Sequence, residues 1–444
     1  MAAKELTTFQ LPIDLGDGLV LRAASAGDAD YLAAFNARVH GSDPQDAEMV
    51  AAWTRDLLSG HHPTVSPSDF TIVAEGKTGK ILSSLCLISQ TWSYGGIPFG
   101  VGRPELVGTD PDYRNRGLVR KQFEVVHSWS RQRGQPVQII TGIPYYYRQF
   151  GYELALELSA SRSVGENMIV PLRPEQDEQY SFCPVEPGDL PGLLANAARI
   201  ALREPLACIR DAEAWHYELW GKSAADIYRV MFCTIQDGDG RVVGYLGAPP
   251  ALWKNAQALT YYELNPGVSY LQVTPAVLRW LWALGQTRGN EKNHCQILSI
   301  RLGSQHPAYC ALNPNLSTAL RPYAYYMRVA DLGGFLAMIR PVLEQRLAES
   351  ACAGHSGEYK IGFYKHGLRL VLENGKISVI EPVNLYWEKY QAHFPDLTFL
   401  QLLFQYRSME ELRGQYADLT AAWELQVLLD AMFPKAASNV WALS

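Results

Sequence analysis

The stretch "VGTDPDYRNRGLVRKQF", from Val107 to Phe123, is the most informative part of the sequence for the fold. An apolar strand-like run passes through a charged turn into a pattern with helical spacing. The turn contains Gly117 and four cations, Arg114, Arg116, Arg120 and Lys121. Basic residues at a helix N-terminus are unfavourable unless an anion binds there. The stretch is therefore either a cradle for an anion or a solvated basic helix start.

The composition limits the classes of protein to consider. A length of 444 residues predicts more than one domain, and an apolar content of 48% is typical of a packed globular protein. The net charge of -6 argues against a general nucleic-acid binder, and no apolar run is long enough for a membrane span. Seven scattered cysteines and an N-terminus without a signal-peptide core predict reduced thiols, no metal site and a cytoplasmic location.

The opening stretch belongs to a predicted mixed α/β segment. The expected order is a strand, two helices, three strands, a helix, a strand, a short helix and a strand. From about residue 180 a weaker echo repeats the hairpin, the helix and the next strand, with an offset of roughly 157 residues for the helix. The echo lacks the glycine and the arginines, and Pro275 is expected at its helix start. We expect a duplicated domain whose second copy does not bind the ligand of the first.

The chain changes character after Tyr323. A helix leads to strands with an Asn374-Gly375 hairpin turn, and three helix-like patterns follow. The tail "KAASNVWALS" carries Trp441, a large apolar residue that we expect to dock on the protein. The third segment is therefore predicted to be an α+β domain.

Two motifs in the first segment resemble the GNAT superfamily of acetyl-CoA-dependent N-acetyltransferases. The loop Arg114-Asn115-Arg116-Gly117-Leu118-Val119 is similar to the family pattern Arg/Gln-x-x-Gly-x-Gly/Ala, with Val119 in place of a small residue. The segment "YYRQFGY", from Tyr146 to Tyr152, is similar to a second family motif. The whole chain resembles the enhanced-intracellular-survival (Eis) type, which has two acetyltransferase copies and a C-terminal sterol carrier protein-like domain. The implied domains are 1–170, 171–325 and 326–444, and the implied assembly is a homo-oligomer, since members of this type are often hexameric.

The resemblance assigns the acetyl-CoA site to the opening stretch. Main-chain groups of Val107, Gly108 and Thr109 would polarise the thioester. The residues expected around the pyrophosphate are Arg114, Asn115, Arg116, Gly117, Leu118, Val119 and Arg120. A primary amine such as a lysine has a pKa near 10.4, so roughly 1 in 2500 molecules is neutral and nucleophilic at pH 7. A general base is therefore useful for transfer to this acceptor.

Three residues are candidates for the general acid and the general base. Tyr147 occupies the general-acid position of the family and is favoured as the acid; the alternative is a core aromatic, because it is one of three adjacent tyrosines. Glu105 lies on the preceding strand, where it is either a base or an ordinary ion-paired carboxylate. In the Eis type the C-terminal carboxylate serves as base, which implies Ser444 here, and Ile140 replaces a histidine of the type member. His61 and His62 are expected to form an exposed loop pair.

Two functions follow from these features. The first is an N-acetyltransferase that acts on a small-molecule or peptide amine, such as an aminoglycoside, a polyamine or a lysine side chain, without nucleic-acid or membrane partners. The second is a protein that binds a lipid or another hydrophobic ligand and carries a decayed acetyltransferase domain.

Overall fold

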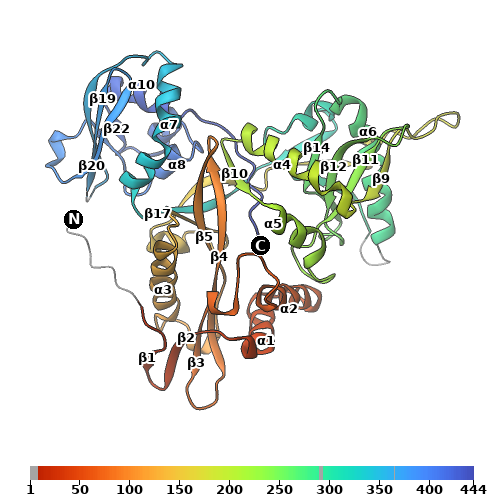
Figure 1. Ribbon diagram of the computed structural model, residues 1–444, viewed down its shortest axis with the longest axis horizontal. Helices are drawn as coiled ribbons and strands as arrows, with labels where there is room; N and C mark the ends of the chain where they lie inside the picture. Colours follow the sequence, from red (N-terminus) through yellow and green to blue (C-terminus); the bar gives the residue numbers. More distant parts are fainter. Residues whose placement is uncertain (1–8, 290–293, 365) are drawn as a thin grey trace.

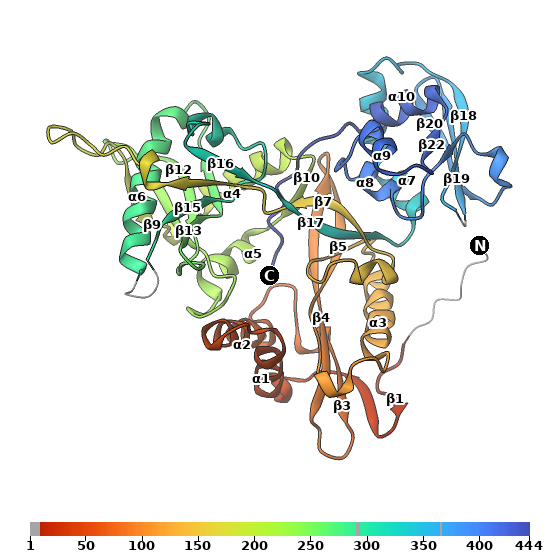
Figure 2. The same ribbon diagram turned by 180° about the vertical axis from the view of Figure 1, so that it is seen from behind.

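The computed structural model describes residues 9–289, 294–364 and 366–444. Figure 1 shows three lobes that meet near the C-terminal end of the chain. The first lobe contains residues 9–158 with the later strand β17, the second contains residues 161–320, and the third contains residues 332–435. The remaining residues 436–444 form a C-terminal segment that runs back between the lobes (Figures 1 and 2).

The first lobe is built on one mixed sheet, with the strand order β1-β2-β3-β4-β5-β6-β17-β7. Its elements along the chain are β1 (Ile13–Gly16), β2 (Leu19–Ala23), α1 (Ala29–His40), α2 (Pro44–Leu58), β3 (Phe70–Glu75), β4 (Ile81–Tyr94), β5 (Ile97–Thr109), α3 (Leu118–Gln132), β6 (Val137–Ile140), the short helix η4 (Tyr146–Phe150), β7 (Glu153–Leu158) and β17 (Tyr323–Val329). This order agrees with the sequence prediction from β2 to β7, whereas the strand β1 was not predicted. The added strand β17 lies between β6 and β7 and comes from much later in the chain.

The strand β5 leaves its neighbour β6 partway along its length. Parallel pairing between them is confined to Val101 with Val137 and Gly102 with Gln138 in the described residues. Further along β5 the register against β4 shifts between Glu105 and Gly108, and Leu106 there has a φ of 51°. Such a bulge bends a strand and increases its twist. A wedge therefore opens between β5 and β6 beside the opening stretch.

The second lobe contains two smaller sheets, with orders β14-β12-β11-β9 and β13-β15-β8-β16. Its elements are β8 (Ser161–Gly165), β9 (Ser181–Pro184), α4 (Leu190–Arg203), β10 (Leu206–Ile209), α5 (Ala212–His216), β11 (Met231–Gln236), β12 (Val242–Ala248), β13 (Ala256–Leu259), β14 (Tyr261–Leu264), α6 (Tyr270–Arg288), β15 (Ile297–Ile300), η8 (Pro307–Ala311) and β16 (Ser317–Leu320). As in the first lobe, an antiparallel hairpin (β11 and β12) is followed by a helix, and β13 pairs in parallel with β15.

Two details of the second lobe differ from the sequence prediction. Helix α6 begins at Tyr270, so Pro275 lies inside it and not at its start. Proline tolerates this second-turn position at the loss of one backbone hydrogen bond. The predicted boundaries at 170/171 and 325/326 also shift, because β8 pairs with β15 and β16, whereas β17 spans residue 325 and pairs with β6 and β7. The chain thus leaves the first sheet after β7, adds β10 to it in antiparallel pairing with β4, and returns to it again in β17.

The third lobe packs helices on a sheet of order β20-β19-β18-β21-β22. Its elements are α7 (Leu332–Ala348), β18 (Gly357–Gly362), β19 (Gly367–Glu373), β20 (Lys376–Val383), β21 (Ala392–His393), α8 (Phe399–Leu403), α9 (Met409–Gln415), β22 (Thr420–Ala421) and α10 (Trp423–Met432). Its apolar core is continuous with that of the first lobe: Phe335 packs against Tyr94 and Phe99. The Tyr94 hydroxyl also donates to the carbonyl of Leu403 at 2.8 Å.

Over the described ranges, the structure contains no helix that combines the length and the apolar character required to cross a membrane.

Candidate active site

A groove of about 780 Å³ lies where the end of β5 meets the start of α3. The C-terminal end of α1 and the short helix η4 complete its walls. Its lining includes all ten residues predicted to bind acetyl-CoA, namely Val107, Gly108, Thr109, Arg114, Asn115, Arg116, Gly117, Leu118, Val119 and Arg120. The structure thus brings these residues together on one open surface, which is large enough for an extended ligand.

The loop at this groove has the backbone conformation that an anion cradle needs. Asn115 and Gly117 have φ values of 63° and 73°, in the left-handed region that these two residue types tolerate best. Gly117 is also the residue that precedes the first turn of α3. The unpaired N–H groups of that first turn and the helix dipole favour a phosphate. The exposed guanidinium groups of Arg114 and Arg116 add positive charge beside them.

Tyr147, the predicted acid, is buried beneath this groove in an aromatic cluster. Its ring lies 6.0 Å from that of Phe123 and 5.5 Å from that of Tyr326, whereas its neighbour Tyr146 lines the groove itself. Burial raises the pKa of Tyr147, and the charge of Glu105 raises it further. The hydroxyl therefore keeps its proton at neutral pH and is available as a donor.

Glu105, a candidate base, forms an ion pair inside the protein. Its Oε1 atom lies 2.7 Å from Nε and 2.6 Å from Nη2 of Arg103, which is itself buried. Burial opposes the charge of Arg103, but the adjacent Glu105 carboxylate keeps the pKa of Arg103 above its ordinary value. The carboxylate is therefore engaged by a permanently charged guanidinium. The geometry agrees with the ion-paired alternative that the sequence left open.

The C-terminal segment reaches the same region. Gln90 on β4 pairs with Leu443 in both directions: its Nε2 donates to the carbonyl at 2.8 Å, and its Oε1 accepts from the Leu443 amide at 3.3 Å. Arg103 Nη1 donates to the same carbonyl at 2.7 Å. Ser444 is therefore buried next to the guanidinium that holds Glu105. The predicted docking of the tail is observed in this contact.

Trp441 anchors this segment on the second lobe. Its ring lies 5.7 Å from the rings of Trp215 and Phe232, and the guanidinium carbon of Arg210 stands 3.9 Å from its centre. We refer to Trp215, Phe232, Tyr261 and Arg210 as the tryptophan cage. The C-terminal segment thus connects the second lobe with strands β4 and β5 of the first.

A group of buried polar residues surrounds Ser444. Lys222 donates to Ser444 Oγ at 3.4 Å and to Glu218 Oε1 at 2.8 Å, and the lysine and glutamate side chains are both 1% exposed. The prediction that His61 and His62 form an exposed pair is wrong for His62, which is buried against the ring of Tyr217 at 4.6 Å. Burial lowers the pKa of His62 to about 3. Tyr217 lies far from His62 in the sequence, so the residues around position 62 do not indicate that this ring covers the histidine.

His40 was not predicted as a site residue, although it lines the groove. It ends α1, and its ring lies against Gly108: a Cβ atom on this glycine would be 3.0 Å from His40 Nε2. Gly108 is thus required for close approach of α1 to β5. Burial lowers the pKa of His40, while the charge of Glu105 and the main chain of Leu106 oppose this shift. The ring is neutral at pH 7.

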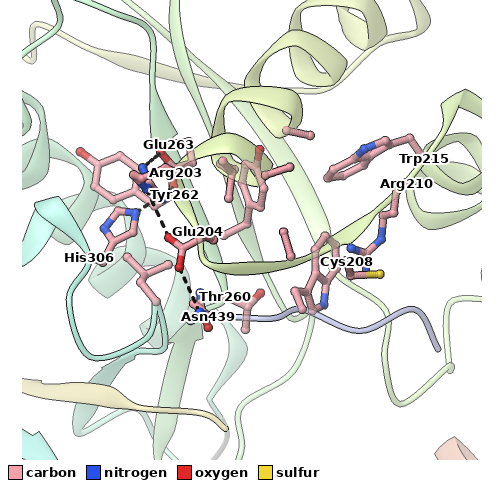
Figure 3. Close-up of a pocket in the computed structure, with 17 residues that line it drawn as sticks. Arg203, Glu204, Cys208, Arg210, Trp215, Thr260, Tyr262, Glu263, His306 and Asn439 are labelled. Carbon is pink, nitrogen blue, oxygen red and sulfur yellow. Dashed lines mark hydrogen bonds and ion pairs between the residues drawn. The ribbon is translucent and has the colours of Figure 1, made fainter. Parts of the chain in front are cut away.

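A much smaller cavity, about 70 Å³ in volume, lies between the second lobe and the C-terminal segment. Figure 3 shows that charged side chains close it by pairing with one another. Arg203 and His306 bind Glu263 at 2.6 and 3.1 Å, and Glu204 accepts from the amide of Asn439 at 3.2 Å. Burial opposes ionisation of Glu263, but the hydrogen bonds from His306 and Arg203 lower its pKa to about 2. A cavity of this size does not accommodate a nucleotide.

Among the described residues, no group of three or more His, Cys, Asp or Glu side chains is arranged to hold a metal ion.

Comparisons with known proteins agree with this architecture. Residues 20–155 match the family model described as an acetyltransferase (GNAT) domain. A search of curated proteins by sequence gives no match. The matched range contains the groove, and it ends before the chain passes into the second lobe.

Solved structures resemble the whole chain. A protein of unknown function from Enterococcus faecalis, described as a probable N-acyltransferase, is 13% identical with a TM-score of 0.67, over 96% of this chain and 100% of that one. A GCN5-related N-acetyltransferase from Anabaena variabilis is 15% identical with a TM-score of 0.63, over 95% and 98%. Eis1 from Mycobacterium abscessus is 14% identical with a TM-score of 0.61, over 96% and 99%. The fold is therefore that of tandem acetyltransferase domains followed by a further α+β domain.

Proposed function

We propose that the protein is an acetyl-CoA-dependent N-acetyltransferase, which acts on a primary amine of an aminoglycoside, a polyamine or a lysine side chain. The observation that carries this proposal is the groove, because it combines the left-handed loop at Gly117, the helix N-terminus and the exposed cations of the opening stretch. Acetyl-CoA would supply an activated acetyl group there. The GNAT domain match over residues 20–155 supports the same chemistry.

The residues of the groove divide into binding and reacting groups. Arg114, Arg116 and the first turn of α3 would hold the pyrophosphate. Beyond the bulge, the edge of β5 that faces the wedge is free of pairing with β6 in the described chain, so main-chain groups from Val107 to Thr109 would face the thioester. Tyr147 would protonate the departing thiolate, since its hydroxyl keeps its proton at neutral pH.

Direct transfer requires that an acceptor amine loses a proton near the thioester. Glu105 and the main-chain carboxyl group of Ser444 are the two candidate bases from the sequence. The ion pair with Arg103 weakens the case for Glu105. Ser444 is buried beside His62 and Lys222, and a carboxylate there would be held by polar neighbours.

Thiol release from acetyl-CoA in the presence of aminoglycosides, polyamines and lysine peptides tests the proposal. We expect release above the rate of spontaneous hydrolysis with at least one amine, together with a rise in melting temperature on addition of CoA. An absence of turnover with every amine and of any CoA-dependent heat shift would favour the alternative of a decayed acetyltransferase that binds a hydrophobic ligand.

A further inference from the structure

We infer that His40 is the general base of the proposed reaction and takes the proton of the acceptor amine at Nε2. This inference rests on the proposed N-acetyltransferase function. It starts from the position of the side chain, since His40 lines the same groove as the predicted acetyl-CoA residues and touches β5 at Gly108. A base must lie close to the atoms that react, and β5 carries the main-chain groups expected to polarise the thioester.

The hydrogen-bonding state of the ring supports this role. His40 Nε2 is shielded from solvent and has no hydrogen-bond partner among the described residues. Buried polar atoms in native proteins are nearly always paired, so an unpaired ring nitrogen covered in the wall of a groove calls for an explanation. A substrate N–H group that enters the groove would supply the missing partner. The acetyl-acceptor amine has this group.

The surroundings of the ring suit a residue that gains a charge during the reaction. The ring is neutral at pH 7, so its lone pair is available. Once protonated, it would be stabilised by the carboxylate of Glu105 on β5, by the main chain of Leu106 and by the C-terminal end of α1. Near this corner Asp110 lies 3.4 Å from Arg38 and 3.9 Å from Lys80, whereas the exposed cations Arg114 and Arg116 line the same groove.

This arrangement also gives Glu105 a role that agrees with its ion pair. The Glu105 carboxylate is engaged by Arg103, and its charge acts on the histidine next to β5. Glu105 is then a positioning residue, and it favours the imidazolium form of His40. Enzymes that activate a nucleophile commonly use a base whose side chain is oriented by a further group, such as a carboxylate that does not touch the substrate.

The proton and electron transfers balance with this assignment. The neutral amine forms a bond to the acetyl carbon, and His40 Nε2 takes one proton from the amine nitrogen. The C–S bond then breaks, and Tyr147 gives its hydroxyl proton to the thiolate sulfur. The products are an amide and a free thiol. A proton returned from His40 to Tyr147 through solvent restores the starting state.

Steady-state kinetics of the full chain test His40, with the amine that gives the highest turnover. We expect His40→Gln to lower kcat by about 10²-fold or more, with little change in the KM for acetyl-CoA. The decline of kcat/KM on the acidic side of the pH profile should disappear in this variant. In His40→Gly, added imidazole should raise the rate of the variant at least tenfold. The increase should be proportional to the concentration of neutral imidazole.

The matched control is His61→Gln, which changes an exposed histidine outside the groove and should keep wild-type kinetics. His40→Gln activity within twofold of wild type, or a loss confined to the KM for acetyl-CoA, would overturn the inference. So would a His40→Gly variant that folds and is indifferent to imidazole. A wild-type chain without turnover on any amine overturns the proposed function and this inference together, whereas an active wild type with an indifferent His40 overturns the inference alone.

Discussion

Gly117 and Gly134 have the same backbone requirement, but only Gly117 lines the groove. They lie at opposite ends of α3, with φ values of 73° and 66°. At both positions an added Cβ would meet no atom within 4 Å. The two glycines therefore differ in location and not in local strain, which makes them a matched pair for mutagenesis.

We predict that Gly117→Ala and Gly134→Ala reduce the free energy of unfolding by a similar amount, about 1 kcal/mol, because alanine is disfavoured at positive φ. Only Gly117→Ala should weaken acetyl-CoA binding, by about tenfold, since Gly117 lies in the loop that lines the groove and Gly134 does not. Calorimetric titration with acetyl-CoA and denaturant unfolding measure the two effects. Equal affinities in the two variants would show that Gly117 does not approach the ligand.

Tyr147→Phe removes only the hydroxyl group and therefore tests Tyr147 as the general acid. We predict a fall in kcat of about 10²-fold, because the thiolate loses its proton donor while the aromatic cluster keeps its packing. Tyr152→Phe is the control, since the Tyr152 hydroxyl bonds to His127 at 2.8 Å in the same cluster. The control should lose stability but keep most of its kcat. A Tyr147→Phe variant with the full wild-type rate would exclude Tyr147 as the acid.

At the scale of elements, the sequence predicted what local patterns encode. The strand, loop and helix around Gly117 and the segment with Tyr147 follow from residue types within a few positions of one another, and both were found where expected. The contacts that complete the site could not be read in this way. Gln90 and Leu443 are separated by 353 positions, and His40 meets Gly108 through packing between helix and strand.

The junction between α2 and the second lobe contains an ionisable pair. Asp56 at the end of α2 accepts from the amide and hydroxyl of Ser223, both at 2.8 Å. Asp226 lies in the same loop region, and its Oδ2 has no partner among the described residues. Burial raises the pKa of Asp226 to about 7, and the adjacent Asp56 raises it too, while Lys222 opposes the shift.

We predict that Asp226→Asn stabilises the protein more at pH 8 than at pH 5. A carboxyl group whose pKa is raised on folding contributes stability that is lost as the pH rises from its unfolded value toward 7. Asparagine does not ionise, so its advantage over aspartate should grow by about 2–3 kcal/mol between pH 5 and pH 7 and then level off. Thermal unfolding across this pH range measures it. The control Asp239→Asn, at an exposed ion pair, should show no such trend.

At the scale of the whole molecule, the C-terminal segment couples three lobes. It leaves the third lobe, places Trp441 in the tryptophan cage of the second lobe and fixes Leu443 on the first. The second acetyltransferase copy borders a cavity of only about 70 Å³, yet it supplies this cage. Its role in anchoring the C-terminal segment was not visible in the sequence, because each cage residue looks like an ordinary core aromatic or surface arginine.

We predict that Trp441→Ala releases the C-terminal segment and lowers kcat by tenfold or more, while acetyl-CoA affinity stays unchanged. Loss of the tryptophan packing costs about 2 kcal/mol, which is enough to populate undocked segments. Hydrogen exchange of the peptide 434–444 should rise in parallel. Trp423→Ala, at an exposed position on α10, is the control and should affect neither measurement. A docked segment with full protection in Trp441→Ala would refute the anchoring role.

The return of the chain to the first sheet in β17 has a consequence for how the protein folds. Tyr323 pairs with Leu158, and Leu320 pairs with Ser161, so the chain enters and leaves the second lobe through one two-stranded ribbon. If β7 and β17 met while residues 159–322 were still unstructured, closing that loop would cost about 4–5 kcal/mol of chain entropy. Prior folding of the second lobe brings its own two ends together and removes most of this cost. The inserted copy is then a folding template for the last strand of the lobe that hosts it.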